Sequence, residues 1–201
     1  MPLLRSSIDY HGLDLSAALC EYARKKISGY NTKERFFEGD MRSFGVGMQF
    51  DCIFIAFNSF LHILSDEDAM SSFQCIREHL KPGGQFILDI LFPNPDFLYR
   101  GREGEDVPVM DFKDSKTGEL IEIFERCEYD NATEICDLKW EYRRQNHPGD
   151  SWVFEYQMRM YYPDTINRML IDAGFTIDDR IGDYDGGRFS ERSALQIYIC
   201  Q

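Results

Sequence analysis

Apolar and polar positions follow two different periods along the chain, and the first half reads as strands alternating with helices. Short apolar runs end in acidic residues at "YHGLDL" and "RFFEGD", and an unbroken apolar run follows at "FDCIFIAF". Residues 16–29 and 65–80 instead carry apolar side chains three and four positions apart, which is the period of a helix. The run "QFILDI" predicts a further strand. This alternation favours an α/β fold, and the unbroken run predicts a parallel strand buried on both faces.

From about residue 107 the period changes to two. The segments "ELIEIFERCEYD", "EICDLKWEYRRQ" and "SWVFEYQMRMYY" alternate apolar and polar residues and are separated by the polar turns "DNAT" and "HPGD". They predict a three-stranded antiparallel sheet, inserted at about 107–162, with one aromatic face. The helical pattern "PDTINRMLIDAGF" and two final strands follow. We therefore expect a single α/β domain over residues 1–201 that carries an inserted sheet.

Composition and charge exclude several classes of function. A hydrophobic content of 43% is enough for a packed core, while the net charge of −13 argues against a nucleic-acid partner. No apolar run is long enough to span a membrane, and the first residues lack the apolar core of a signal peptide. The six cysteines follow no metal-like spacing. We expect a cytoplasmic protein with no membrane partner, no metal and no disulfide.

Acidic residues end successive predicted strands, where ligands of open α/β sheets bind. Asp14 follows the first strand and Asp40, with Met41 beside it, follows the second. Two such carboxylates suit a nucleoside, one for the ribose hydroxyls and one for the adenine amino group, with a thioether against the purine ring. Each acid alone is better explained as a turn or cap residue, but the two together at successive strand ends favour a nucleoside pocket. Asp14 alone would also serve the ribose of a nicotinamide cofactor in a dehydrogenase.

The chain resembles the class I S-adenosylmethionine-dependent methyltransferases at "GLDLSAALCEYARKK", "FFEGDMRSF", "FDCIFIAFNSFLHI", "LKPGGQFILDI" and "MLIDAGF". The blocks keep the family's order and approximate spacing. The resemblance implies a Rossmann-like, mostly parallel sheet with a C-terminal antiparallel strand pair, S-adenosylmethionine as cofactor and a small-molecule acceptor. It also implies roles for particular residues: ribose binding by Asp14 next to Leu15, adenine binding by Asp40 and Met41, and contact with the methionine part by Phe57 and Asn58.

The family's first strand and its Gly-x-Gly turn have no counterpart in the sequence. "PLLRSS" resembles the end of the helix that follows that turn, so we expect the given chain to begin just after it. The lost strand would leave a sheet edge open, and self-association is the expected consequence. A degenerate methyltransferase fold that acts through protein contacts is the alternative to an enzyme.

The residues expected to act on the acceptor are His62 and the end of the insert. His62 is the histidine best placed as a base for an O or N acceptor, although a histidine in "FLHIL" is also typical of a packed side chain. Arg159 and Tyr161 are expected to contact substrate. The alternating aromatic face of the insert has the alternative explanation of plain core.

Overall fold

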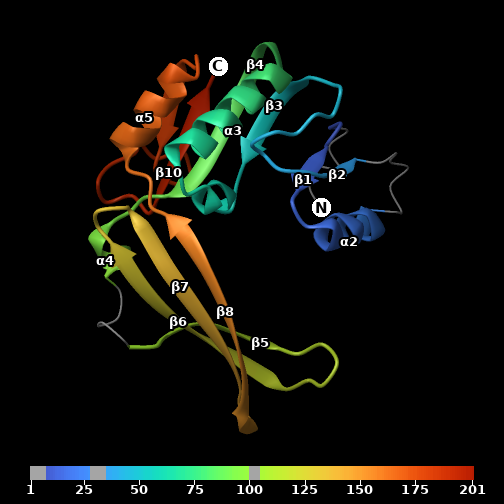
Figure 1. Ribbon diagram of the computed structural model, residues 1–201, viewed down its shortest axis with the longest axis vertical. Helices are drawn as coiled ribbons and strands as arrows, with labels where there is room; N and C mark the ends of the chain where they lie inside the picture. The colour runs from blue at the N-terminus through green and yellow to red at the C-terminus, as the bar shows by residue number, and fades with distance from the viewer. Residues whose placement is uncertain (1–7, 28–34, 100–104) are drawn as a thin grey trace. The chain divides into compact units, whose positions relative to one another are not determined.

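The computed structural model describes residues 8–27, 35–99 and 105–201 (Figure 1). The chain divides into two compact units. One combines the chain up to Ile53 with Asp66–Gln85, and the other combines Phe54–Ser65 with Phe86–Gln201. Two strands, β3 (Phe50–Ile55) and β4 (Leu80–Leu91), begin in the first unit and end in the second.

The first unit opens on a short parallel strand pair. Its elements are β1 (Gly12–Asp14), α2 (Ala17–Ile27), β2 (Phe36–Glu38) and α3 (Asp66–His79). β1 and β2 run parallel, with Asp14 opposite Glu38. Helix α2 begins as the sequence predicts, because the hydroxyl of Ser16 accepts a hydrogen bond of 3.3 Å from the backbone N–H of Leu19. The parallel pairing therefore places the C-terminal ends of β1 and β2 at the same edge of this two-stranded sheet.

A four-stranded sheet has the order β3-β4-β10-β9. β10 (Leu195–Cys200) pairs antiparallel with β4 and with β9 (Ile177–Ile181), which confirms the predicted C-terminal antiparallel pair. Helix α5 (Pro163–Asp172) precedes β9 and buries Leu170 completely. The buried amide of Gln196 donates hydrogen bonds to the carbonyls of Leu91 and Tyr161, so a polar group in this core is satisfied.

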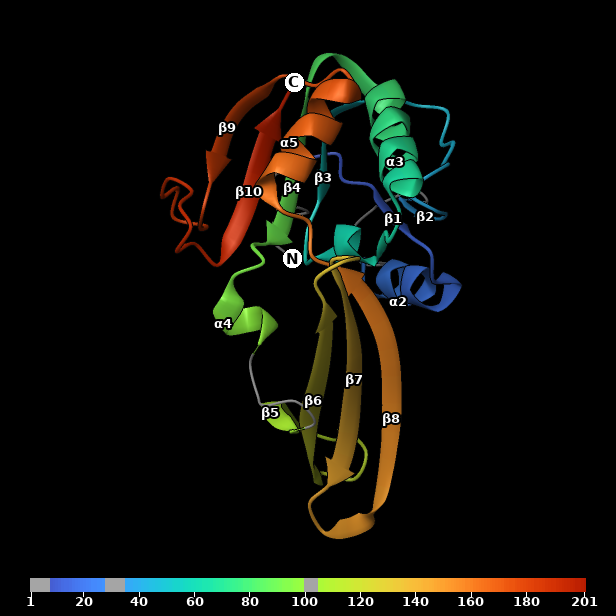
Figure 2. The same cartoon turned by 60° about the vertical axis from the view of Figure 1, so that its left-hand side comes forward.

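The inserted sheet has four strands, one more than the sequence pattern predicts. It consists of β5 (Val107–Lys113), β6 (Leu120–Asp130), β7 (Ile135–Arg144) and β8 (His147–Arg159), paired antiparallel in that order (Figure 2). The added strand contains Pro108 and a register shift before Met110. Proline is tolerated there because β5 lies at the sheet edge. The hairpin turn lies at 145–146, so "HPGD" belongs to β8.

The α/β class is confirmed, with a parallel pair in β1 and β2 and antiparallel pairing around β10 and throughout the insert. The prediction that the run "FDCIFIAF" forms a strand buried on both faces is wrong. Cys52 is exposed and 46% of Phe54 is accessible, because β3 is an outer strand of its sheet. Within the described part of the chain, no helix combines the length and the hydropathy needed to cross a membrane.

Candidate functional site

The acidic residues predicted from strand ends lie side by side in the first unit. The backbone N–H of Gly39 donates a 3.0 Å hydrogen bond to the carbonyl oxygen of Asp14, so the segment that carries Asp40 leaves β2 against the end of β1. The Asp14 carboxylate accepts a 2.8 Å hydrogen bond from the N–H of Ser16, which is the turn role considered above. Leu15 is 73% exposed beside it. A ribose contact by Asp14 and Leu15 stays a prediction.

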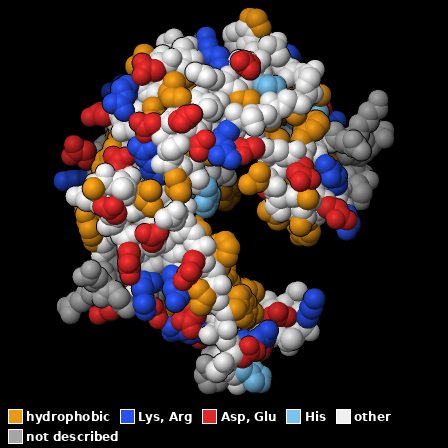
Figure 3. Space-filling model, viewed as in Figure 1, with side chains coloured by type: hydrophobic (Ala, Val, Ile, Leu, Met, Phe, Trp, Pro, Cys, Tyr) orange, Lys and Arg blue, Asp and Glu red, His pale blue; other side chains and the backbone are white. Residues whose placement is uncertain are grey.

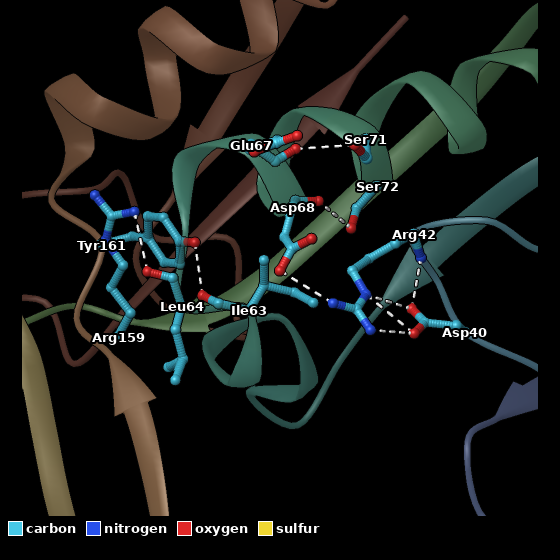
Figure 4. A network of polar contacts seen from close by, with 10 residues as sticks. All are labelled: Asp40, Arg42, Ile63, Leu64, Glu67, Asp68, Ser71, Ser72, Arg159 and Tyr161. Atoms are coloured by element: carbon cyan, nitrogen blue, oxygen red, sulfur yellow. Dashed lines mark hydrogen bonds and ion pairs between the residues drawn. The ribbon is translucent and has the colours of Figure 1, made fainter.

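Asp40 is held by an arginine that follows it closely in sequence (Figure 4). Arg42 Nε lies 2.9 and 3.0 Å from the two Asp40 carboxylate oxygens, and Arg42 Nη2 lies 2.6 Å from Oδ2. The same guanidinium reaches Asp68 Oδ2 of α3 at 3.0 Å. Hydrogen bonds from Arg42 hold the pKa of Asp40 below its usual range. Asp40 is therefore an ionised acceptor in a fixed orientation, with Met41 next to it in a turn.

The chain after β3 contains two consecutive left-handed residues. Phe57 has a φ of 55° and Asn58 a φ of 60°, a region that costs a bulky side chain energy. Phe57 is 93% exposed, so burial of its ring does not offset this cost. Asn58 Oδ1 accepts a 2.8 Å hydrogen bond from the backbone N–H of Leu91, and this bond holds the two left-handed residues in place. Strain of this kind often collects at ligand sites. A contact of Phe57 and Asn58 with the methionine part of a cofactor stays a prediction.

His62 ends the short helix η1 (Ser59–His62), and its side chain is exposed. Its Nδ1 lies 3.2 Å from the carbonyl oxygen of Gln157 on β8. A carbonyl only accepts, so Nδ1 carries the proton and donates it. In the neutral ring, Nε2 is then left as an acceptor. Sequence reasoning found His62 but not its partner, because a backbone carbonyl has no signature in the sequence.

Arg159 and Tyr161 anchor the backbone that follows His62 (Figure 4). The hydroxyl of Tyr161, which is fully buried, donates a 2.7 Å hydrogen bond to the carbonyl of Ile63. The Arg159 guanidinium lies 4.6 Å from the centre of the Tyr161 ring and reaches Glu134 Oε2 at 3.3 Å. Arg159 Nη1 also lies 3.5 Å from the carbonyl oxygen of Leu64, so both residues hold the backbone that follows His62. Their contact with substrate stays a prediction.

The inserted sheet carries the predicted aromatic face together with a buried acid that the sequence pattern did not reveal. Tyr142 and Trp152 stack with ring centroids 5.0 Å apart. On the same face, Glu125 is only 6% exposed and accepts a 2.6 Å hydrogen bond from Trp140 Nε1. Hydrophobic side chains gather over this sheet in Figure 3. Within the residues that the structure describes, no three metal-ligating side chains come together.

Comparison with known sequences points to one family. Residues 1–84 match the family model described as a methyltransferase domain. A dTDP-3-amino-3,4,6-trideoxy-alpha-D-glucopyranose N,N-dimethyltransferase of Streptomyces venezuelae is 30% identical over 81 residues, or 40% of this chain. The match spans 32% of that relative, about a third of its length.

Comparison with solved structures extends the likeness to the whole chain. The CcbJ methyltransferase of Streptomyces caelestis is 21% identical with a TM-score of 0.84, over 100% of this chain and 82% of its own. The sugar N-methyltransferase KedS8 of a Streptoalloteichus species is 17% identical with a TM-score of 0.74, over 98% and 73%. CalS10, an amino pentose methyltransferase of Micromonospora echinaspora solved with S-adenosylmethionine bound, has a TM-score of 0.71 and 17% identity, over 99% and 76%. The predicted resemblance is confirmed at the level of the fold.

Proposed function

We propose, from the premise that this chain has the fold of the S-adenosylmethionine-dependent methyltransferases, that it transfers a methyl group from S-adenosylmethionine to a small-molecule acceptor. The observation that carries this proposal is the pair of acids, Asp14 and Asp40, at the ends of two adjacent parallel strands. Ligands of open α/β sheets bind at such strand ends. Both acids lie within residues 1–84, the part of the chain that matches the methyltransferase-domain model, and this match supports the same function.

The proposed cofactor contacts follow from the chemistry of these side chains. The Asp14 carboxylate accepts hydrogen bonds from the ribose hydroxyls, and the exposed Leu15 packs on the sugar. Asp40, ionised and oriented by Arg42, accepts from the adenine amino group, and Met41 places a polarizable thioether against the purine. For Phe57 and Asn58, the contact with the methionine part that the family resemblance implies stays a prediction.

We propose a nitrogen acceptor, because the relatives named above include an N,N-dimethyltransferase and a sugar N-methyltransferase. His62 is the proposed base. The S–CH3 bond breaks as the N–CH3 bond forms, and a proton on the acceptor nitrogen passes to His62 Nε2, whose acceptor state follows from the Nδ1 contact with Gln157. Hydrogen bonds to the backbone after His62 hold the imidazole in position. Positioning of the reacting groups accounts for much of the acceleration in a direct methyl transfer.

Cofactor binding to the full chain is the direct test. Calorimetry with S-adenosylmethionine is expected to give micromolar binding, and Asp14→Asn is expected to weaken it by about tenfold or more, since one charge-assisted hydrogen bond is lost. Asp51→Asn is the matched control, because Asp51 lies in the same unit in an exposed ion pair with Lys81. No heat at millimolar ligand, or an equal loss in both variants, would refute the proposal and favour a degenerate fold that acts through protein contacts.

A further inference from the structure

The aromatic face of the inserted sheet is defined here by Trp140, Tyr142, Trp152, Phe154 and Tyr156. The register places Trp140 opposite Phe154 and Tyr142 opposite Trp152, so all lie on one side of β7 and β8. Trp152 is 41% exposed and Phe154 is 54% exposed. A core face would bury these rings, so the alternative of plain core does not account for them.

A buried carboxylate lies within this face. Glu125 of β6 is directly opposite Trp140, which places its side chain on the same side of the sheet. Its carboxylate accepts the 2.6 Å hydrogen bond from Trp140 Nε1, so it lies against the Trp140 ring. Ring faces and a carboxylate both attract a cation, and the attraction grows where water is excluded. The face therefore combines ring surface with negative potential.

The same face has little positive charge with which to bind a phosphate. Of the Lys and Arg residues in the described strands β6, β7 and β8, the register places Arg144 alone on it. The Arg144 guanidinium lies over the Trp152 ring and is paired with Glu119 and Asp150, each at 3.0 Å. With a net charge of −13 on the whole chain, a nucleoside diphosphate would meet repulsion without a compensating cation.

We propose that the aromatic face binds the non-reacting body of the acceptor, and that this acceptor is an amine with an aromatic or apolar ring, not a sugar carried on a nucleoside diphosphate. That the bound amine is the methyl acceptor rests on the proposed function. That the face binds an amine with a ring is argued from the inserted sheet alone. It separates this chain from the Streptomyces venezuelae relative, whose name specifies a dTDP-sugar.

The chain contains two tryptophans, and both belong to the aromatic face, so tryptophan fluorescence reports on this surface directly. The probe is 2-phenylethylamine, titrated into the full chain, with 2-phenylethanol as its uncharged analogue and thymidine diphosphate as the competing class. We expect the amine to quench the emission and to bind about fivefold more tightly than the alcohol. Thymidine diphosphate is expected to leave the emission unchanged.

Two variants locate the binding, and one serves as a control. Phe154→Ala is expected to weaken amine binding about fivefold, since one ring contact is lost. Val153→Ala removes a similarly exposed apolar side chain from the opposite face of the same strand and is expected to have no effect. Glu125→Gln keeps an acceptor for Trp140 but removes the charge, so it is expected to abolish the preference for amine over alcohol.

Tighter binding of thymidine diphosphate than of the amine would overturn the inference, as would an equal loss in Phe154→Ala and Val153→Ala. Failure of the proposed function gives a different pattern. In that case calorimetry detects no S-adenosylmethionine binding while quenching by the amine persists. If the inference alone fails, cofactor binding and its loss in Asp14→Asn remain.

Discussion

Replacement of Tyr161 by Phe tests whether the buried hydrogen bond from Tyr161, which follows β8, stabilises the backbone after His62. The change removes the hydroxyl that donates to the Ile63 carbonyl at 2.7 Å. It keeps the ring, whose centroid lies 5.2 Å from that of the Phe60 ring and which contacts the Arg159 guanidinium. No cavity larger than one oxygen forms, so the effect isolates the hydrogen bond from the packing of the ring.

The expected cost follows from burial. Tyr161 is 0% exposed and Ile63 is 8% exposed, so the carbonyl left behind gains little from water. An unsatisfied buried acceptor costs about 1–3 kcal/mol. Urea unfolding with a slope of about 2 kcal/mol/M would then show a midpoint lower by about 0.5–1.5 M.

Tyr22→Phe is the matched control, because Tyr22 is 60% exposed on α2 and a surface change of this kind costs about 0.5 kcal/mol or less. The same measurement on both variants decides the question. If Tyr161→Phe unfolds at the same urea concentration as the control, the buried hydrogen bond does not stabilise this segment and the positioning role fails. In the methyl transfer proposed above, the expected companion effect is a lower kcat with unchanged cofactor affinity.

Three further predictions concern the sites in turn. Arg42→Met is expected to raise the pKa of Asp40 toward its ordinary value of about 4, seen by NMR titration of the carboxyl. Because the pKa of Asp40 is depressed in the folded state, the Asp40–Arg42 pair stabilises the fold above the unfolded-state pKa, and this stabilisation is lost as the pH falls through the folded-state pKa. An Asp40 pKa that is unchanged in Arg42→Met would contradict the ion pair. Phe57→Gly is expected to stabilise the fold by about 0.5–1 kcal/mol in thermal unfolding, since glycine adopts the left-handed φ freely and an exposed ring is lost; a lower Tm would show that the ring is needed. His62→Gln is expected to lower kcat about a hundredfold with S-adenosylmethionine affinity unchanged, and full activity would exclude it as the base.

Several features of this protein are local enough to be predicted from the sequence. Helices α2, α3 and α5 follow from apolar residues at helical spacing, and the N-cap at Ser16 follows from its side chain. The acids at the ends of β1 and β2 could be assigned to one edge, because parallel strands present their carboxyl ends together. The aromatic face followed from a period of two, since alternate residues share a side of a strand.

The sequence by itself determined the α/β class, the two acids and the alternating face, because each depends on residues that are near one another along the chain. Only the tertiary structure decided what those residues contact. His62 meets the carbonyl of Gln157 from 95 positions away, and Glu125 meets Trp140 across a strand pair. The exposure of Cys52 likewise depends on the place of β3 in its sheet. Backbone carbonyls and strand neighbours are set by long-range pairing, whose register is not written in any single segment.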